Sequence, residues 1–172
     1  MKILGVIALS HVLVPLAPAE TWPGDPGFVV VQSEMSRAAG GMALHWAVAG
    51  ARQRLEQPAC RGLLAEFSDA SGRPLQENLD ALGETGGSYL ARILFADGSG
   101  RARCSGDEAY AFTTPGRRVV YVCGRAFKNL ASRDPVRAQA IVIHEALHTL
   151  GLGENPPTSA EITARVVARC RW

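Results

Sequence analysis

The stretch IVIHEALHTLGLGE, residues 141–154, restricts the fold of this chain more than any other part of the sequence. It places His144 and His148 four residues apart, with Glu145 directly after the first histidine. In an α-helix such a pair shares one face at about 6 Å, so both imidazoles can reach one metal ion. Glu145 is rotated by about 100° from His144, which places its carboxylate beside the metal. We therefore predict a zinc-binding helix with Glu145 as general base.

A core helix that contains two histidines by chance is the alternative explanation of this stretch. Its apolar positions predict that one face packs in the core: Ala140, Ile143, Leu147 and Leu150. Without a metal, however, such a helix would bury ionisable groups unpaired, and each would cost free energy. The zinc interpretation is therefore favoured, on a helix that is also structural.

Two downstream glutamates could supply the third protein ligand. Glu161 completes a T-x-x-E capping box with Thr158, which explains it as part of a helix start. Glu154 lies in a short loop without a comparable structural role, and its alternative explanation is an ordinary solvated acid. With either residue the site has two histidines, one glutamate and an open position, which is typical of catalytic zinc.

The N-terminal residues MKILGVIALSHVLVPLAPAE resemble a secretory signal. One basic residue precedes an apolar run that is too short to span a membrane, and Ala-Pro-Ala follows. We expect cleavage after Ala19, a signal peptide over 1–19, a single domain over 20–172, and a secreted or periplasmic protein. The formal charge of +2 gives no electrostatic reason to expect nucleic acid or anionic lipid as a partner.

Four cysteines, an even number in an exported chain, predict two disulfides: Cys60, Cys104, Cys123 and Cys170. Three pairings are possible, and our guess is Cys60–Cys104 with Cys123–Cys170. A cysteine-ligated zinc is disfavoured because no two of these residues form the usual CxxC half-site.

Helix and strand patterns divide the chain into a helical first half, a short β region and two closing helices. Helices are expected over 31–54, from Pro58 and over 74–82, and strands at 88–97, 109–113 and 118–123. The closing helices should begin at Asp134-Pro135 and at Thr158. The fold class is therefore α+β, with a small mixed sheet and flanking helices.

The segment over residues 109–161 resembles the zincin metallopeptidases, in which HExxH lies on a helix that follows a strand. The resemblance implies that this strand, here 118–122, is a sheet edge to which the peptide substrate adds. HEALHTLGLGE also resembles the metzincin pattern HExxHxxGxxH, with Gly151 at the helix break and Glu154 in place of the third histidine. The metzincin Met-turn is missing, since no methionine follows Met42.

In gluzincins the third ligand is a glutamate on a later helix, as Glu161 would be. The separation of 13 residues between His148 and Glu161, however, is shorter than the separation usual in that family. We therefore expect His144, His148 and Glu154 to bind one zinc ion. The expected function is a monomeric, secreted zinc metallopeptidase (a hydrolase) acting on peptides or proteins. Two alternatives stay open: a non-catalytic module with structural zinc or none, and hydrolysis of a non-peptide amide.

Overall fold

A computed structural model describes residues 41–106 and 109–171; the predicted signal peptide lies outside them. The helices and strands follow the order α2 (Gly41–Leu55), α3 (Pro58–Arg61), α4 (Leu63–Glu66), α5 (Leu75–Asp80), α6 (Gly86–Leu90), β1 (Leu94–Asp97), η1 (Ala102–Cys104), β2 (Ala111–Thr113), β3 (Val119–Val122), α7 (Gly124–Arg133), α8 (Pro135–Thr149) and α9 (Ser159–Arg169). This arrangement confirms the predicted α+β class. Each helix in these ranges is too short or too polar to cross a membrane.

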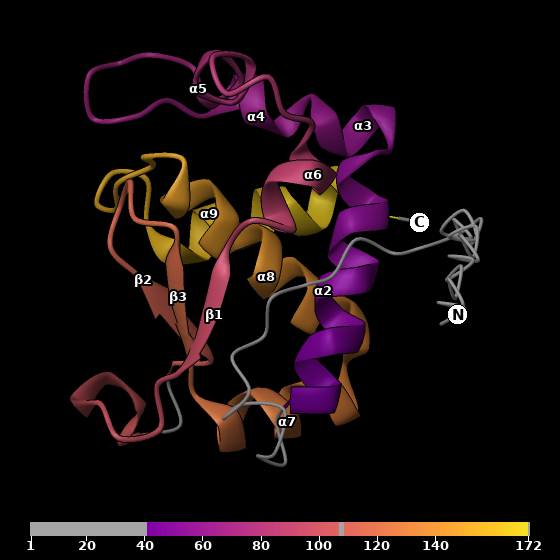
Figure 1. Cartoon of the computed structure of the whole chain (residues 1–172), viewed down its shortest axis with the longest axis vertical. Helices are drawn as coiled ribbons and strands as arrows, with labels where there is room; N and C mark the ends of the chain where they lie inside the picture. Colours follow the sequence, from indigo (N-terminus) through magenta and orange to yellow (C-terminus); the bar gives the residue numbers. More distant parts are fainter. Residues whose placement is uncertain (1–40, 107–108, 172) are drawn as a thin grey trace, which may run out of the picture.

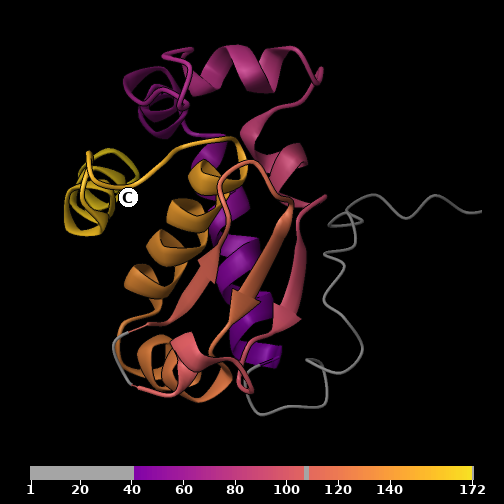
Figure 2. The ribbon, with the colours of Figure 1, turned by 90° about the vertical axis from the view of Figure 1, so that its left-hand side faces the viewer.

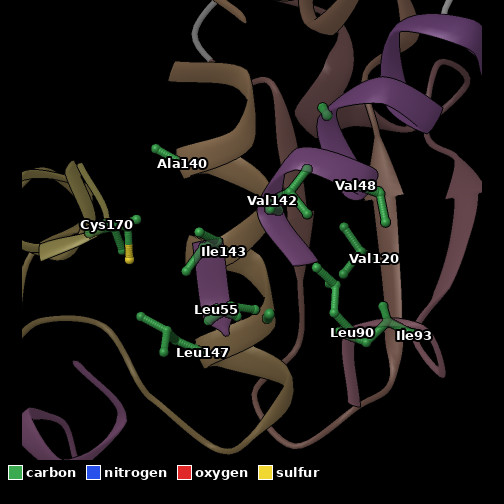
Figure 3. Close-up of a cluster of buried hydrophobic side chains, with 14 of the residues drawn as sticks. Val48, Leu55, Leu90, Ile93, Val120, Ala140, Val142, Ile143, Leu147 and Cys170 are labelled. Atoms are coloured by element: carbon green, nitrogen blue, oxygen red, sulfur yellow. The ribbon is translucent and has the colours of Figure 1, made fainter. Parts of the chain in front are cut away.

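The long helix α8 occupies the middle of the fold. It packs against α2, α7, α9 and the strands β2 and β3, and Figure 2 shows it between the sheet and α9. In Figure 1, α7 lies at one end of this body and α3, α4 and α5 at the other. The apolar positions of α8 pack as the sequence predicts, since Ile143 and Leu147 are at most 1% exposed. They belong to the same buried cluster as residues of α2 and β3, such as Val48 and Val120, and Figure 3 shows Val142 of α8 next to Val48.

The sheet has the order β1-β3-β2, with β1 parallel and β2 antiparallel to β3. The expectation that residues 118–122 form the edge strand beside the site is wrong, because β3 is the central strand. Its buried valines, Val120 and Val122, pack in the core as a central strand requires. The edge strand next to α8 is β2, which follows η1 and reaches β3 through the Thr114–Arg117 turn.

Local signals at the closing helices are confirmed. Asp134 caps α8 by accepting a hydrogen bond from the Arg137 backbone N–H, and Pro135 follows at the first helical position. Thr158 and Glu161 form the predicted capping box of α9. By contrast, α7 was not predicted, and α6 (Gly86–Leu90) includes residues 88–90, where the start of a strand was expected.

Both disulfides differ from our guess: the pairs are Cys60–Cys170 and Cys104–Cys123. The parallel pairing of β1 and β3 explains the second bridge. Both strands end at the same side of the sheet, so η1, which follows β1, lies beside Cys123 at the end of β3. The first bridge joins α3 to the end of α9, two helices that contact each other. Two disulfides fit a location outside the reducing cytoplasm.

Candidate metal centre

Three side chains form a group that could hold a metal ion: His144, His148 and Glu154, whose ligand atoms all lie within 4.8 Å of one another. The histidines come from adjacent turns of α8, and their Nε2 atoms are 3.0 Å apart. Glu154 Oε1 lies 3.7 Å from Nε2 of His144 and 3.3 Å from Nε2 of His148. Two nitrogens bound tetrahedrally to one zinc are separated by about 3.3 Å, so the spacing suits a shared metal.

The other ring nitrogen of each histidine is held by the surrounding structure. Nδ1 of His148 donates to the backbone carbonyl of Leu152 at 2.7 Å, since a carbonyl can only accept. Nδ1 of His144 lies 2.9 Å from Thr163 Oγ1 on α9. A proton on Nδ1 leaves the Nε2 lone pair available, and such partners fix the orientation of metal-binding imidazoles.

A tight turn after α8 brings Glu154 to the two histidines. Gly151 has φ = +114°, a conformation that side-chain-bearing residues rarely adopt. The turn is closed by hydrogen bonds from the Gly151 N–H to the His148 carbonyl and from the Leu152 N–H to the Leu147 carbonyl. The chain thereby reverses within a few residues, and the glutamate returns to the helix face that carries the histidines.

Glu161 lies outside this group. Its Oε2 accepts hydrogen bonds from the backbone N–H and the hydroxyl of Thr158, both at 2.8 Å. These two bonds hold the pKa of the Glu161 carboxyl below its usual value. The side chain is exposed at the start of α9, where it caps a helix. The residue that competed with Glu154 as a ligand therefore has a structural role.

Glu145 is buried beside the group, with 5% of its surface exposed. Its Oε2 has no hydrogen-bond partner. Burial, with a smaller contribution from the charge of Glu154, raises the pKa of Glu145 to about 8 in the metal-free site. Burial and the neighbouring His148 lower the pKa of His144 to about 4, so its imidazole is neutral at pH 7. A buried carboxyl oxygen without a hydrogen-bond partner costs free energy of folding. Its presence in a native structure therefore indicates a further role, such as contact with an ion or a ligand.

A cleft of about 980 Å³ opens onto these four residues. Its lining comes from η1, β2, α8 and α9, including Arg103, Tyr110, Phe112, Arg137, Ile141 and Thr163. Arg137 and Ile141 precede His144 by seven and three residues, a helical spacing that places them on the same face of α8. The edge strand β2 forms one wall, so an extended chain could lie along it.

The tyrosines and His45 differ in their position relative to the cleft. The chain has three tyrosines, and of these only Tyr110 lines the cleft, where its hydroxyl could meet a substrate. Tyr89 is buried and its hydroxyl donates to Thr149 Oγ1, while Tyr121 stacks on Phe112. His45 is exposed on α2, in edge contact with Trp46, and lies outside the metal group.

Sequence reasoning missed the residues that support the site from elsewhere in the fold. Thr163 is an ordinary helical residue in the sequence, and no local pattern connects it with His144. Arg137 and Ile141 could have been found, because their spacing from the histidines repeats the helical period. Comparisons of the chain with protein-family models, with curated proteins and with solved structures find no match.

Proposed function

We propose that the chain is a zincin-like zinc metallopeptidase, in which His144, His148 and Glu154 hold one zinc ion. The residues suit this metal, because two imidazoles and one carboxylate are ligands that catalytic zinc sites use. The observation that carries the proposal is the Glu145 side chain, whose Oε2 has no hydrogen-bond partner and which is buried beside a three-residue metal group at a cleft. A purely structural zinc site would not explain why the carboxyl of Glu145, which is not one of the three ligands, is buried there.

When bound, zinc supplies a Lewis acid that lowers the pKa of a coordinated water to about 7 and polarises the substrate carbonyl. Glu145 then acts as the general base: its carboxylate accepts the proton of the attacking water and later delivers it to the leaving amine. The Nδ1 partners, the Leu152 carbonyl and the Thr163 hydroxyl, would hold both imidazoles in the orientation needed to bind the metal. Burial of Glu145 strengthens its interactions by excluding water.

An extended peptide is the substrate shape that the cleft favours. Among the described residues β2 pairs with β3 only, so its other edge is open toward the cleft. A peptide that adds to this edge would gain backbone hydrogen bonds independent of sequence. The edge strand that we expected at 118–122 is thus replaced in this role by Ala111–Thr113. The two disulfides support export of the enzyme.

Glu145→Gln tests the proposal. We expect the wild-type protein to bind one zinc per chain and to hydrolyse peptide bonds in an unfolded protein substrate. The variant should stay folded and keep its zinc but lose activity by about 10²- to 10⁴-fold, the usual contribution of a general base. Glu161→Gln is the matched control, because it changes a glutamate outside the metal group, and it should stay active.

Two results would count against the proposal. A wild-type protein that binds zinc but cleaves no peptide bond would favour a non-catalytic module. Complete unfolding when a chelator removes the metal would indicate a structural zinc site, because such sites contribute directly to folding.

A further inference from the structure

The turn that carries Leu152 and Glu154 is held from outside by two residues far away in sequence, Asp69 and Asn78, which we call the brace. Asp69 lies in the loop between α4 and α5, and Asn78 lies on α5. Both contact the segment that follows α8. These contacts join the small helices at one end of the molecule to the metal centre.

Asp69 organises its own loop and also reaches the turn. Its Oδ1 accepts hydrogen bonds from the backbone N–H groups of Ser71 and Arg73, at 2.8 and 3.0 Å. The Ser71 hydroxyl donates to the same oxygen at 2.6 Å. The backbone of Asp69 forms an isolated antiparallel bridge with Leu152. The loop is therefore fixed in shape and paired with the residue whose carbonyl orients His148.

Asn78 connects this loop with the end of the active helix. Its Nδ2 donates to Asp69 Oδ2 at 2.9 Å and to the backbone carbonyl of Leu150 at 3.1 Å. Backbone carbonyls in the last turn of a helix have no hydrogen-bond partner within the helix. The Asn78 amide supplies a donor to one of them, the carbonyl of Leu150. One amide group thus ties the loop to the start of the turn.

The position of Gly151 shows how closely the loop and the turn fit. A Cβ placed on Gly151 would lie 3.0 Å from Asp69 Cβ, tighter than an ordinary contact. A residue with a side chain would therefore crowd Asp69 at this position, and the hydrogen bond from Asn78 to the Leu150 carbonyl opposes movement of the turn away from the brace. Two metal ligands depend on this arrangement: His148 through the Leu152 carbonyl, and Glu154, two residues further along.

We propose that Asp69 and Asn78 are positioning residues of the metal centre, which set its affinity by fixing the turn that carries Leu152 and Glu154. This inference rests on the proposed function, because it takes Glu154 as a zinc ligand. The alternative is that the brace only stabilises the fold. The two explanations differ in one measurable quantity, the affinity of the folded protein for zinc.

The test compares Asn78→Ala with Gln76→Ala. Gln76 lies on the same helix and also donates a side-chain hydrogen bond, to Asp80 Oδ1 at 2.7 Å, but away from the turn. We expect Asn78→Ala to weaken zinc binding by about 10- to 100-fold in competition with a chromogenic chelator, as loss of outer partners does. Gln76→Ala should leave zinc affinity unchanged. Asn78→Ser, a milder change that shortens the side chain, should also weaken binding.

The possible results distinguish a positioning role of the brace from a role in fold stability alone. Unchanged zinc affinity in Asn78→Ala and Asn78→Ser, even with a lower melting temperature of the metal-free protein, overturns the inference and leaves the proposed function intact. A wild-type protein that binds no zinc overturns both. Failure of both Asn78 variants to fold overturns the inference alone, because the brace would then be needed for the fold.

Discussion

Replacing Gly151 by alanine should perturb the metal centre through the backbone. Gly151 has φ = +114°, and an added Cβ would lie 3.0 Å from Asp69 Cβ. Gly153, two residues later in the same turn, has no positive φ, and an added Cβ there would meet nothing within 4 Å. The two glycines therefore form a matched pair, because the same substitution is strained at one position and open at the other.

The expected size of the effect follows from these environments. Strained backbone at a side-chain-bearing residue costs about 1–3 kcal/mol, whereas Gly→Ala at a compatible position stabilises by about 0.4–1 kcal/mol through the unfolded state. For a chain of 172 residues, each kcal/mol shifts Tm by about 2–4 °C. Gly151→Ala should therefore lower Tm by several degrees, and Gly153→Ala should raise it slightly or leave it unchanged.

Thermal unfolding of the two variants, followed by circular dichroism with and without zinc, measures this difference. Gly151→Ala should also bind zinc more weakly than Gly153→Ala, because displacement of the turn moves Glu154 away from the histidines. Equal Tm values and equal zinc affinities for the two variants would refute the reasoning, since the conformation of Gly151 would then have no consequence for the site.

Three further outcomes are expected. Glu154→Ala should lose tight zinc binding and Glu161→Ala should keep it, as measured by metal analysis after dialysis; the reverse result would identify Glu161 as the ligand. Replacing Cys60 and Cys170 by serine should lower the free energy of unfolding in urea by about 4–5 kcal/mol, because this bridge spans 110 residues; a change below about 1 kcal/mol would contradict this. Burial raises the pKa of Glu145 to about 8 in the metal-free protein, so the fold favours the protonated form and loses stability as pH rises through 8. Between pH 6.5 and 8 the loss should be about 2 kcal/mol in chelator-treated protein, and an equal loss in Glu145→Gln would show that another group causes it.

The different environments of Glu154 and Glu161 show how local chemistry and geometry combine. The sequence explains Glu161 by its capping box with Thr158, and both hydrogen bonds of that box are present. Glu154 can lie near the histidines only if the chain turns back tightly after α8. Gly151 predicts such a turn, and the positions of Glu154 Oε1 and the two Nε2 atoms agree with it.

The errors in the sheet and the disulfides have a common origin. A strand pattern does not specify its neighbours, so residues 118–122 could equally have been an edge or a central strand. The pairing of Cys104 with Cys123 likewise depends on β1 and β3 being parallel and ending at the same side. Both facts concern contacts between segments that lie far apart along the chain.

The amino-acid sequence is sufficient to predict the features that depend on neighbours within a few residues. These are the i, i+4 spacing of His144 and His148, the caps of α8 and α9, and Gly151 at the end of α8. Contacts in the folded chain were needed to show which strand borders the cleft, which cysteines pair, and which distant residues contact His144 and the turn after α8. Thr163, Asp69 and Asn78 belong to this second set, because their partners come within hydrogen-bond distance only when the whole chain packs.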